Sequence, residues 1–158
     1  MDWMLFMVFF GACAAAASTG AMFPPDAWYR TLTKPAWTPP DWVFPVTWTV
    51  LYVLIAFAAT RVAALPGAEL ALAFWALQMT LNTLWSPIFF GLRRIRAALV
   101  AVGALWAAVF GAMVTLFRLD VIAGAMFVPY LVWVSIAAAL NFWIWRNNED
   151  IYAQQSEA

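Results

Sequence analysis

The sequence predicts an all-α integral membrane protein, a single five-transmembrane-helix bundle with almost no soluble part. Of its 158 residues, 66% are hydrophobic and 10% are charged, and the mean hydropathy is +0.84. A soluble domain carries roughly 45–50% apolar and about 25% charged residues. The excess apolar surface is therefore expected to face lipid. Five apolar stretches follow one another along the chain, each near the roughly 20 residues that one helical span requires.

The apolar stretches are separated by helix-ending residues. The first is followed by Pro24 and Pro25, which cannot donate a hydrogen bond into a continuing helix. Pro66 and Gly67 close the second stretch, and the third stops at Gly91. None of the five carries a charge near its middle. The expected helices cover residues 3–22, 43–64, 70–90, 97–116 and 121–145, with a long loop over 23–42 and a polar C-terminal tail over 146–158.

The first apolar stretch is interpreted as a retained helix rather than a signal peptide. A signal peptide begins with a basic segment, whereas the only early charge here is Asp2. The apolar run also continues to Met22, which is long enough to span a bilayer.

The loop over residues 23–42 is rich in proline and aromatic residues, among them Trp28, Tyr29, Trp37 and Trp42. A purely solvated loop has no need of three tryptophans. Either it lies in the headgroup region as an aromatic belt, or it folds over the helix bundle as a lid.

Basic residues predict the orientation in the membrane. With five spans, the long loop, the third connection and the C-terminal tail lie on one side. The eight basic residues divide into Arg61 and Arg118 on one side and six on the other, namely Arg30, Lys34, Arg93, Arg94, Arg96 and Arg146. The positive-inside rule places the six in the cytoplasm and the N-terminus outside.

The composition excludes several classes of function. The formal net charge is zero and there is no histidine, so nucleic acid is not an expected partner. No metal site, imidazole-ligated haem or Ser-His-Asp hydrolase is expected. The single cysteine, Cys13, cannot form an internal disulfide and is expected to be a small packing residue. Ion-coupled transport is disfavoured, because it uses ionisable groups at membrane depth.

Two helices carry small residues four apart, which allow helices to approach closely in lipid. Such faces serve as internal seams or as a dimer interface, and internal packing is the expected role for most of them. The two faces are Ala12, Ala16 and Gly20 on the first helix, and Gly103, Ala107 and Gly111 on the fourth.

Polar and aromatic residues recur within the expected spans at spacings that place them on shared helix faces. The groups are Trp48 with Tyr52, Asn82 with Trp85, and Trp133 with Ala137 and Asn141. One interpretation is that the two asparagines join helices to one another, because an unpaired amide in an apolar medium costs roughly 2 kcal/mol or more. The other is that these faces converge on a cavity under the long loop, suited to a flat, apolar ligand.

The motifs themselves resemble those of the tryptophan-rich sensory protein/translocator protein family, also called the peripheral-type benzodiazepine receptor family. The eleven tryptophans fit that name. The resemblance covers essentially the whole chain. It is carried by Lys-Pro-Ala-Trp-Thr-Pro-Pro at 34–40 with Trp42, Phe44-Pro45 and Trp-Thr-Val-Leu-Tyr at 48–52; by Leu-Asn-Thr-Leu-Trp-Ser-Pro-Ile-Phe-Phe-Gly at 81–91; and by Pro-Tyr-Leu-Val-Trp at 129–133 with Leu140-Asn141-Phe142.

The resemblance implies a five-helix bundle, commonly a homodimer, that binds porphyrins such as protoporphyrin IX and haem. It also implies binding of synthetic isoquinoline carboxamide and benzodiazepine-type ligands. The implied role is that of a receptor or sensor regulating tetrapyrrole metabolism or a stress response, with no required cofactor. Carried over position by position, the pocket is lined by Trp37, Trp48, Tyr52, Asn82, Trp85, Trp133, Ala137 and Leu140, and closed from the loop by Trp28 and Tyr29.

Two further functions stay open. The resemblance also allows a light-dependent porphyrin-degrading enzyme, in which Trp48 and Trp133 would be the reacting residues. A passive carrier of porphyrins or lipids is the other alternative.

Two positions depart from patterns found in the family. Many bacterial relatives have an aromatic residue where this chain has Ala36. Mammalian members carry a proposed cholesterol motif with a central tyrosine, where this chain has Phe142. Sterol binding is therefore not expected, and the resemblance is to a bacterial member in a cell membrane.

Overall fold

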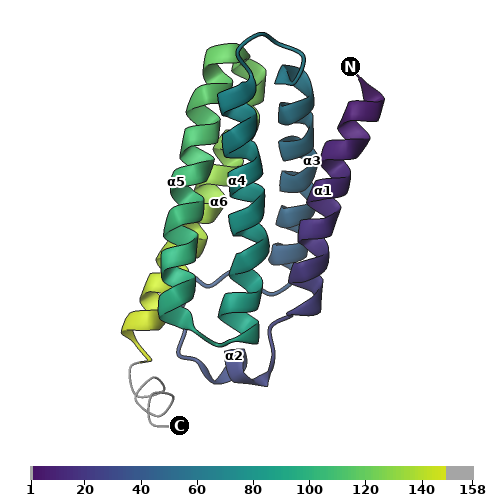
Figure 1. The fold of residues 1–158 in the computed structure, drawn as a ribbon. Helices are drawn as coiled ribbons and strands as arrows, with labels where there is room; N and C mark the ends of the chain where they lie inside the picture. Colours follow the sequence, from purple (N-terminus) through teal and green to yellow (C-terminus); the bar gives the residue numbers. More distant parts are fainter. Residues whose placement is uncertain (1, 149–158) are drawn as a thin grey trace.

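The computed structural model describes residues 2–148, and within that range every regular element is helical (Figure 1). Residues 149–158 of the predicted polar tail lie outside the described part. The elements in chain order are α1 (Trp3–Met22), α2 (Ala27–Thr31), α3 (Val43–Val62), α4 (Glu69–Ser86), the π-helical turn η1 (Pro87–Gly91), α5 (Ile95–Leu119) and α6 (Val121–Arg146).

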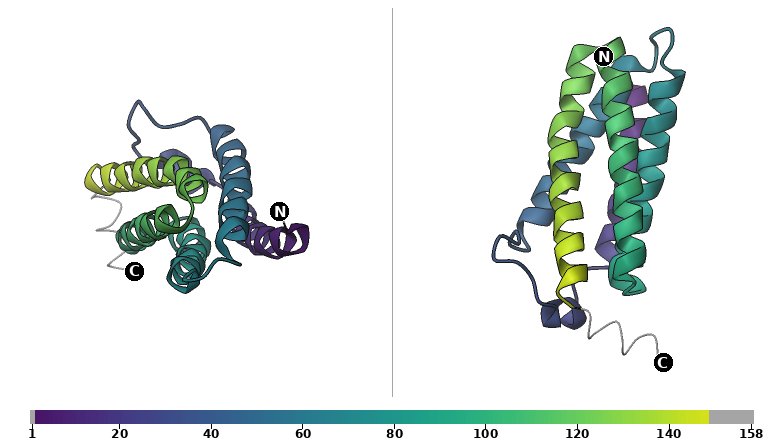
Figure 2. Two further views of the ribbon diagram at one scale, coloured as in Figure 1. Left: turned by 90° about the horizontal axis from the view of Figure 1, so that it is seen from above. Right: turned by 90° about the vertical axis from the view of Figure 1, so that its left-hand side faces the viewer.

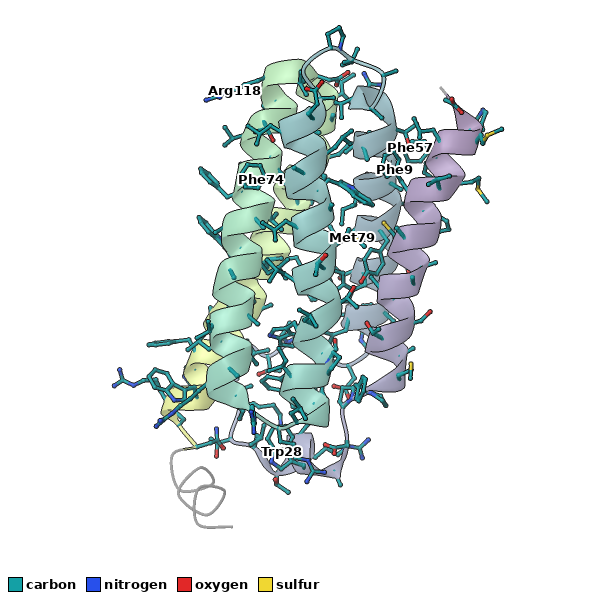
Figure 3. All side chains as sticks on the ribbon, viewed as in Figure 1. Phe9, Trp28, Phe57, Phe74, Met79 and Arg118 are labelled. Atoms are coloured by element: carbon teal, nitrogen blue, oxygen red, sulfur yellow. The ribbon has the colours of Figure 1, made fainter. Side chains whose placement is uncertain are left out.

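The five long helices form a ring. Helix α1 contacts α3 and α4, α3 contacts α6, and α5 contacts both α4 and α6. Viewed along the bundle, α1 lies at the outer edge (Figure 2), and within it only Cys13 and Ala16 are buried. Aromatic side chains pack in the seam between α1 and its neighbours: Phe6 packs on Phe57 with ring centroids 4.4 Å apart, and Phe9 packs on Trp75 at 4.9 Å. Figure 3 labels Phe9 and Phe57 in this region.

Four of these helices, α1, α3, α5 and α6, are long and apolar enough to cross a membrane. Helix α4 runs beside them but is less apolar, because it carries the polar side chains of Gln78, Thr80, Asn82 and Thr83. The architecture is therefore the predicted helical membrane bundle, with one helix that is polar on part of its surface.

The third expected helix, over residues 70–90, is not a continuous α-helix. It changes at Pro87 into a π-helical turn, in which the Leu92 N–H donates to the Pro87 carbonyl at 2.8 Å. Pro87 has no N–H to donate one turn back. The carbonyl of Thr83 instead faces the Thr19 hydroxyl of α1 at 3.4 Å.

The other boundaries differ from expectation by a few residues. Helix α3 ends at Val62 rather than at 64, and the chain then turns through Gly67 with a φ of 80°. Helix α5 is longer than the expected 97–116, and the 23–42 segment contains the short helix α2. That helix forms because the Asp26 carboxylate accepts from the Tyr29 N–H at 3.0 Å and caps its first turn.

The end of the bundle opposite the loop is held by one ion pair. Arg61 near the end of α3 forms a bidentate ion pair with Asp120: Nε donates to Oδ1 at 3.2 Å, and Nη2 donates to Oδ2 at 2.7 Å. Asp120 also caps α6 by accepting from the Ala123 N–H at 2.8 Å. One carboxylate thus ties the α5–α6 connection to α3.

The two small-residue faces have mixed surroundings. On α5, a Cβ at Gly111 would lie 2.6 Å from the Phe74 ring of α4, whereas one at Gly103 would meet nothing within 4 Å. Ala107 is exposed. On α1, Ala16 is buried and Ala12 is exposed. Each face therefore contributes only some of its members to internal seams.

Candidate ligand-binding cavity

A cavity of about 490 Å³ lies among the long helices, at the end of the bundle covered by the loop. Its walls are mainly apolar, with a few polar groups from Tyr29, Asp41, Thr49, Tyr52, Asn82 and Ser86. This combination is typical of small-molecule sites, which measure roughly 300–1,000 Å³. The apolar lining includes Ala16, Ala17, Gly20 and Ala21 of α1, Phe44 and Trp48 of α3, Trp85 of α4, Phe90 of η1, Val102 and Leu105 of α5, and Trp133, Val134 and Ala137 of α6.

Aromatic rings from α3 and α6 form one wall of the cavity. Trp48 stacks on Tyr52, with centroids 5.3 Å apart and planes 27° from parallel. Phe44 meets Trp133 edge to face at 5.5 Å. The wall from α1 consists of small side chains. The cavity is thus lined by large flat rings and by a smooth helix face.

A polar network connects three helices beside the cavity. The Tyr52 hydroxyl donates to Asn82 Oδ1 at 3.3 Å, and Asn82 Nδ2 donates to the Tyr130 hydroxyl at 2.9 Å. The Tyr130 hydroxyl donates in turn to Gln78 Oε1 at 2.9 Å. Asn82 therefore serves both expected roles, because it joins α3, α4 and α6 and also lines the cavity.

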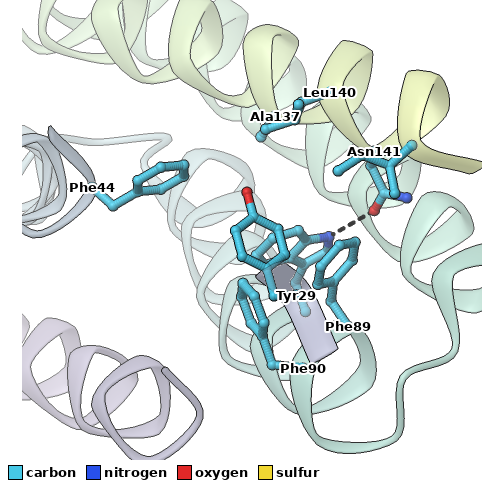
Figure 4. Close-up of a pocket in the computed structure, with 9 residues that line it drawn as sticks. Tyr29, Phe44, Phe89, Phe90, Ala137, Leu140 and Asn141 are labelled. Carbon is cyan, nitrogen blue, oxygen red and sulfur yellow. Dashed lines mark hydrogen bonds between the residues drawn. The ribbon is translucent and has the colours of Figure 1, made fainter. Parts of the chain in front are cut away.

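A second polar contact fixes the floor near η1. The Trp85 indole N–H donates to Asn141 Oδ1 at 3.3 Å (Figure 4). Asn141 Nδ2 donates in turn to the Ile95 carbonyl at 3.2 Å. Trp85 also stacks on Phe89 at 5.1 Å. Beside these groups lies a smaller pocket of about 30 Å³, near the size of one water molecule. It shares five lining residues with the large cavity: Tyr29, Phe44, Trp85, Phe90 and Ala137.

The loop folds over this end of the bundle. Tyr29 is buried and packs edge to face on Phe90 at 5.4 Å. Arg93 forms an ion pair with Asp26 at 3.0 Å. By contrast, Trp37 and Trp42 are 51% and 67% exposed. The first half of the loop therefore acts as the cover, while the two exposed tryptophans point outward as an aromatic belt would.

The surroundings of the cover shift the pKa values of Tyr29 and Asp26 in opposite directions. Burial, aided by the nearby Asp41 carboxylate, raises the pKa of Tyr29 to about 12. The Tyr29 N–H, with the Arg93 guanidinium, lowers the pKa of Asp26. At neutral pH Tyr29, like any tyrosine of ordinary pKa, presents an uncharged hydroxyl to the cavity.

The comparisons with known proteins decide the family. The model of the TspO/MBR family matches residues 4–146. The chain belongs to the TspO/MBR family. It is 52% identical over 148 residues to the tryptophan-rich sensory protein of Cereibacter sphaeroides, covering 94% of each chain. It is 50% identical over 152 residues to the protein CrtK of Rhodobacter capsulatus, covering 94% of this chain and 95% of that one. The human translocator protein is 33% identical over 126 residues, which are 77% of this chain and 75% of that one.

In this TspO/MBR protein most of the sequence-predicted site residues lie together. Seven line the large cavity: Tyr29, Trp48, Tyr52, Asn82, Trp85, Trp133 and Ala137. Leu140 lines the smaller pocket. Trp28 and Trp37 line neither of these cavities. Trp28 is part of the cover and packs on Phe89 at 5.9 Å, with the Arg93 guanidinium 5.6 Å from its ring.

Several residues of the site were missed from the sequence. Phe44 and Tyr130 stand within two of the family-like motifs, yet the spacing of residues does not place them at the site. Gln78 lies one turn before Asn82 on α4, so its spacing was a usable signal for the network. The wall from α1 was signalled in part by the small-residue face containing Ala16 and Gly20.

Proposed function

We propose that this TspO/MBR protein is a membrane receptor or sensor whose cavity binds porphyrins, including protoporphyrin IX and haem. The same cavity is proposed to take synthetic isoquinoline carboxamide and benzodiazepine-type ligands. Binding would regulate tetrapyrrole metabolism or a stress response, with no required cofactor. One observation carries the proposal: aromatic rings from separate helices meet around a single apolar cavity under the loop.

The lining favours recognition of a ring system rather than of a metal. No His, Cys or Met side chain is among the lining residues of the cavity. The Tyr29 hydroxyl is protonated at neutral pH, as an ordinary phenol is, and burial raises its pKa further, to about 12. Stacking and apolar contact would therefore supply most of the binding energy, with roughly 0.5–1.5 kcal/mol per aromatic contact beyond burial.

Quenching of tryptophan fluorescence by protoporphyrin IX in detergent tests the proposal. Trp133→Ala and Trp48→Phe should each weaken binding by about two- to tenfold, because each loses part of a ring contact. Trp106→Phe is the matched control, since Trp106 is on the outer face of α5, 37% exposed, and bonded to Ser135. Unchanged affinity in both cavity variants would overturn the assignment of the site.

A light-dependent porphyrin-degrading activity is a second candidate, because the two expected reacting residues, Trp48 and Trp133, both line the cavity. A photoexcited porphyrin supplies its own reactivity, so the protein need only hold it beside an oxidisable indole. Loss of the porphyrin absorption band under illumination should be faster with the protein than in detergent alone. Equal rates would rule this activity out.

We further propose that the N-terminus lies outside a bacterial cell membrane, that the loop faces the cytoplasm, and that the protein forms a homodimer. The loop and the end of α6 lie at one end of the bundle and the N-terminus at the other (Figure 1), which supports counting their basic residues together. Accessibility of single cysteines at positions 30 and 118, in a Cys13→Ala background, tests the orientation. Cross-linking in membranes tests the homodimer.

A further inference from the structure

The charged groups at the cavity are unbalanced. Among the lining residues Asp41 is the one acidic side chain, and no Lys or Arg is present. The Asp41 carboxylate is exposed, and within residues 2–148 it forms no ion pair or side-chain hydrogen bond. Asp41 lies two residues before α3, near the Tyr29 phenol, and its charge contributes to the raised pKa of that phenol. Asp41 is therefore the one charged side chain that lines the loop end of this cavity.

Two basic residues near the cover, Lys34 and Arg93, are bonded to groups other than Asp41. The Lys34 ammonium donates to the carbonyls of Tyr29 and Leu32 at 2.7 and 3.0 Å and lies 4.6 Å from the centre of the Tyr29 ring. Arg93 is paired with Asp26. Neither side chain lines the cavity, so neither places its charge against a bound ligand.

We propose that Asp41 sets the charge preference of the cavity. It favours flat ligands that place a cationic or neutral hydrogen-bond-donating group at the loop end, and it disfavours carboxylates there. The inference rests on the proposed function, because it assigns the class of ligand to the same cavity. For a porphyrin with two carboxylates, it means that these groups point away from Asp41.

Three versions of one ring isolate the effect of charge: protoporphyrin IX, its dimethyl ester, and its bis-amide with ethylenediamine, which carries two ammonium groups. The ring and its stacking are the same in all three. Affinities are measured by tryptophan quenching for the wild-type protein, Asp41→Asn and Glu69→Gln. Glu69 is the matched control, because it is an exposed acidic residue in the first turn of α4, at the opposite end of the bundle.

In Asp41→Asn, the ratio of affinities for the ammonium and carboxylate forms should fall by about five- to tenfold, the effect of a unit charge a few ångströms away at a solvated surface. The affinity for the neutral ester should stay within twofold. Glu69→Gln should leave all three affinities unchanged. Raising the salt concentration should reduce the wild-type ratio but not that of Asp41→Asn, because exposed charges are screened.

The outcomes separate the two proposals. If all three compounds bind, and the ratio of affinities for the ammonium and carboxylate forms is the same in the wild type and in Asp41→Asn, the role of Asp41 would be overturned. The receptor function would then remain intact. An equal loss of all three affinities in Asp41→Asn would also overturn it, since the effect would then be on the loop rather than on charge. If none of the three compounds binds to the wild-type protein, both the role of Asp41 and the receptor function would be overturned.

Discussion

The Asn148 side chain and the Thr33 backbone exchange two hydrogen bonds between positions 115 residues apart. Asn148 Oδ1 accepts from the Thr33 N–H at 2.8 Å, and Asn148 Nδ2 donates to the Thr33 carbonyl at 3.0 Å. Asn148 is only 5% exposed, so water competes poorly for these bonds. The cover of the cavity is therefore fastened to the end of α6, in addition to the Asp26–Arg93 pair near η1.

Asn148→Ala should loosen the cover while leaving the walls of the cavity intact. The change removes two hydrogen bonds to the Thr33 backbone, a net loss of about 0.5–1.5 kcal/mol for each bond. Bound protoporphyrin IX should dissociate faster, and residues 23–42 should become more sensitive to protease. Asn147→Ala is the control, because Asn147 is exposed and its amide bonds only the Trp143 carbonyl of the same helix. Equal dissociation rates in both variants would contradict the fastening role.

Tyr130→Phe should destabilise the bundle more than Tyr52→Phe. The Tyr130 hydroxyl accepts from Asn82 and donates to Gln78, both at 2.9 Å, so its removal leaves two buried amides short of a partner. The loss is about 1–3 kcal/mol per group. Tyr52 makes one longer bond, at 3.3 Å to Asn82. Thermal unfolding in detergent measures the difference, and an equal decrease in both variants would argue against the central place of Tyr130.

Gly111→Ala should lower the unfolding temperature, because the added Cβ would meet the Phe74 ring at 2.6 Å. Overpacking of this kind costs about 1–3 kcal/mol. Gly103→Ala on the same helix adds a methyl group where nothing lies within 4 Å, and it should have little effect. Two equally stable variants would mean that the α4–α5 seam can accommodate the methyl group.

Asp120→Asn should remove a pH-dependent part of the stability. The Arg61 guanidinium, helped by the Ala123 N–H, holds the pKa of Asp120 below its ordinary value. A lowered folded-state pKa stabilises the protein above the unfolded value of about 3.9, and this stabilisation is lost as the pH falls through the folded pKa. Asparagine can still cap α6, so the variant removes mainly the charge.

The unfolding temperature of Asp120→Asn should therefore lie below that of the wild type at pH 6–8, with the gap narrowing below about pH 4. Glu69→Gln, which alters an exposed acidic residue on α4, serves as the control. A gap that persists unchanged at pH 3 would show that the carboxylate charge is not responsible.

Much of the site could be predicted because helix periodicity places residues four apart on one face. Trp48 with Tyr52 and Trp133 with Ala137 do line one cavity. Periodicity does not place one helix relative to another, however. Trp37 stands in the same motif as Trp48 yet is 51% exposed, because the loop turns it outward. Gln78 and Tyr130 join Asn82 only through the packing of α4 against α6.

By itself the sequence determined the class of the protein, the approximate extent of its long helices and the family to which it belongs. These follow from composition, local hydrogen bonding and motif order, which are properties of contiguous residues. The tertiary structure alone decided that large rings and small side chains from different helices line one cavity, that Asn148 fastens the loop, and that Asp41 is the charged side chain among the lining residues. Contacts between residues far apart in the chain depend on how helix surfaces fit together, and no local pattern encodes that fit.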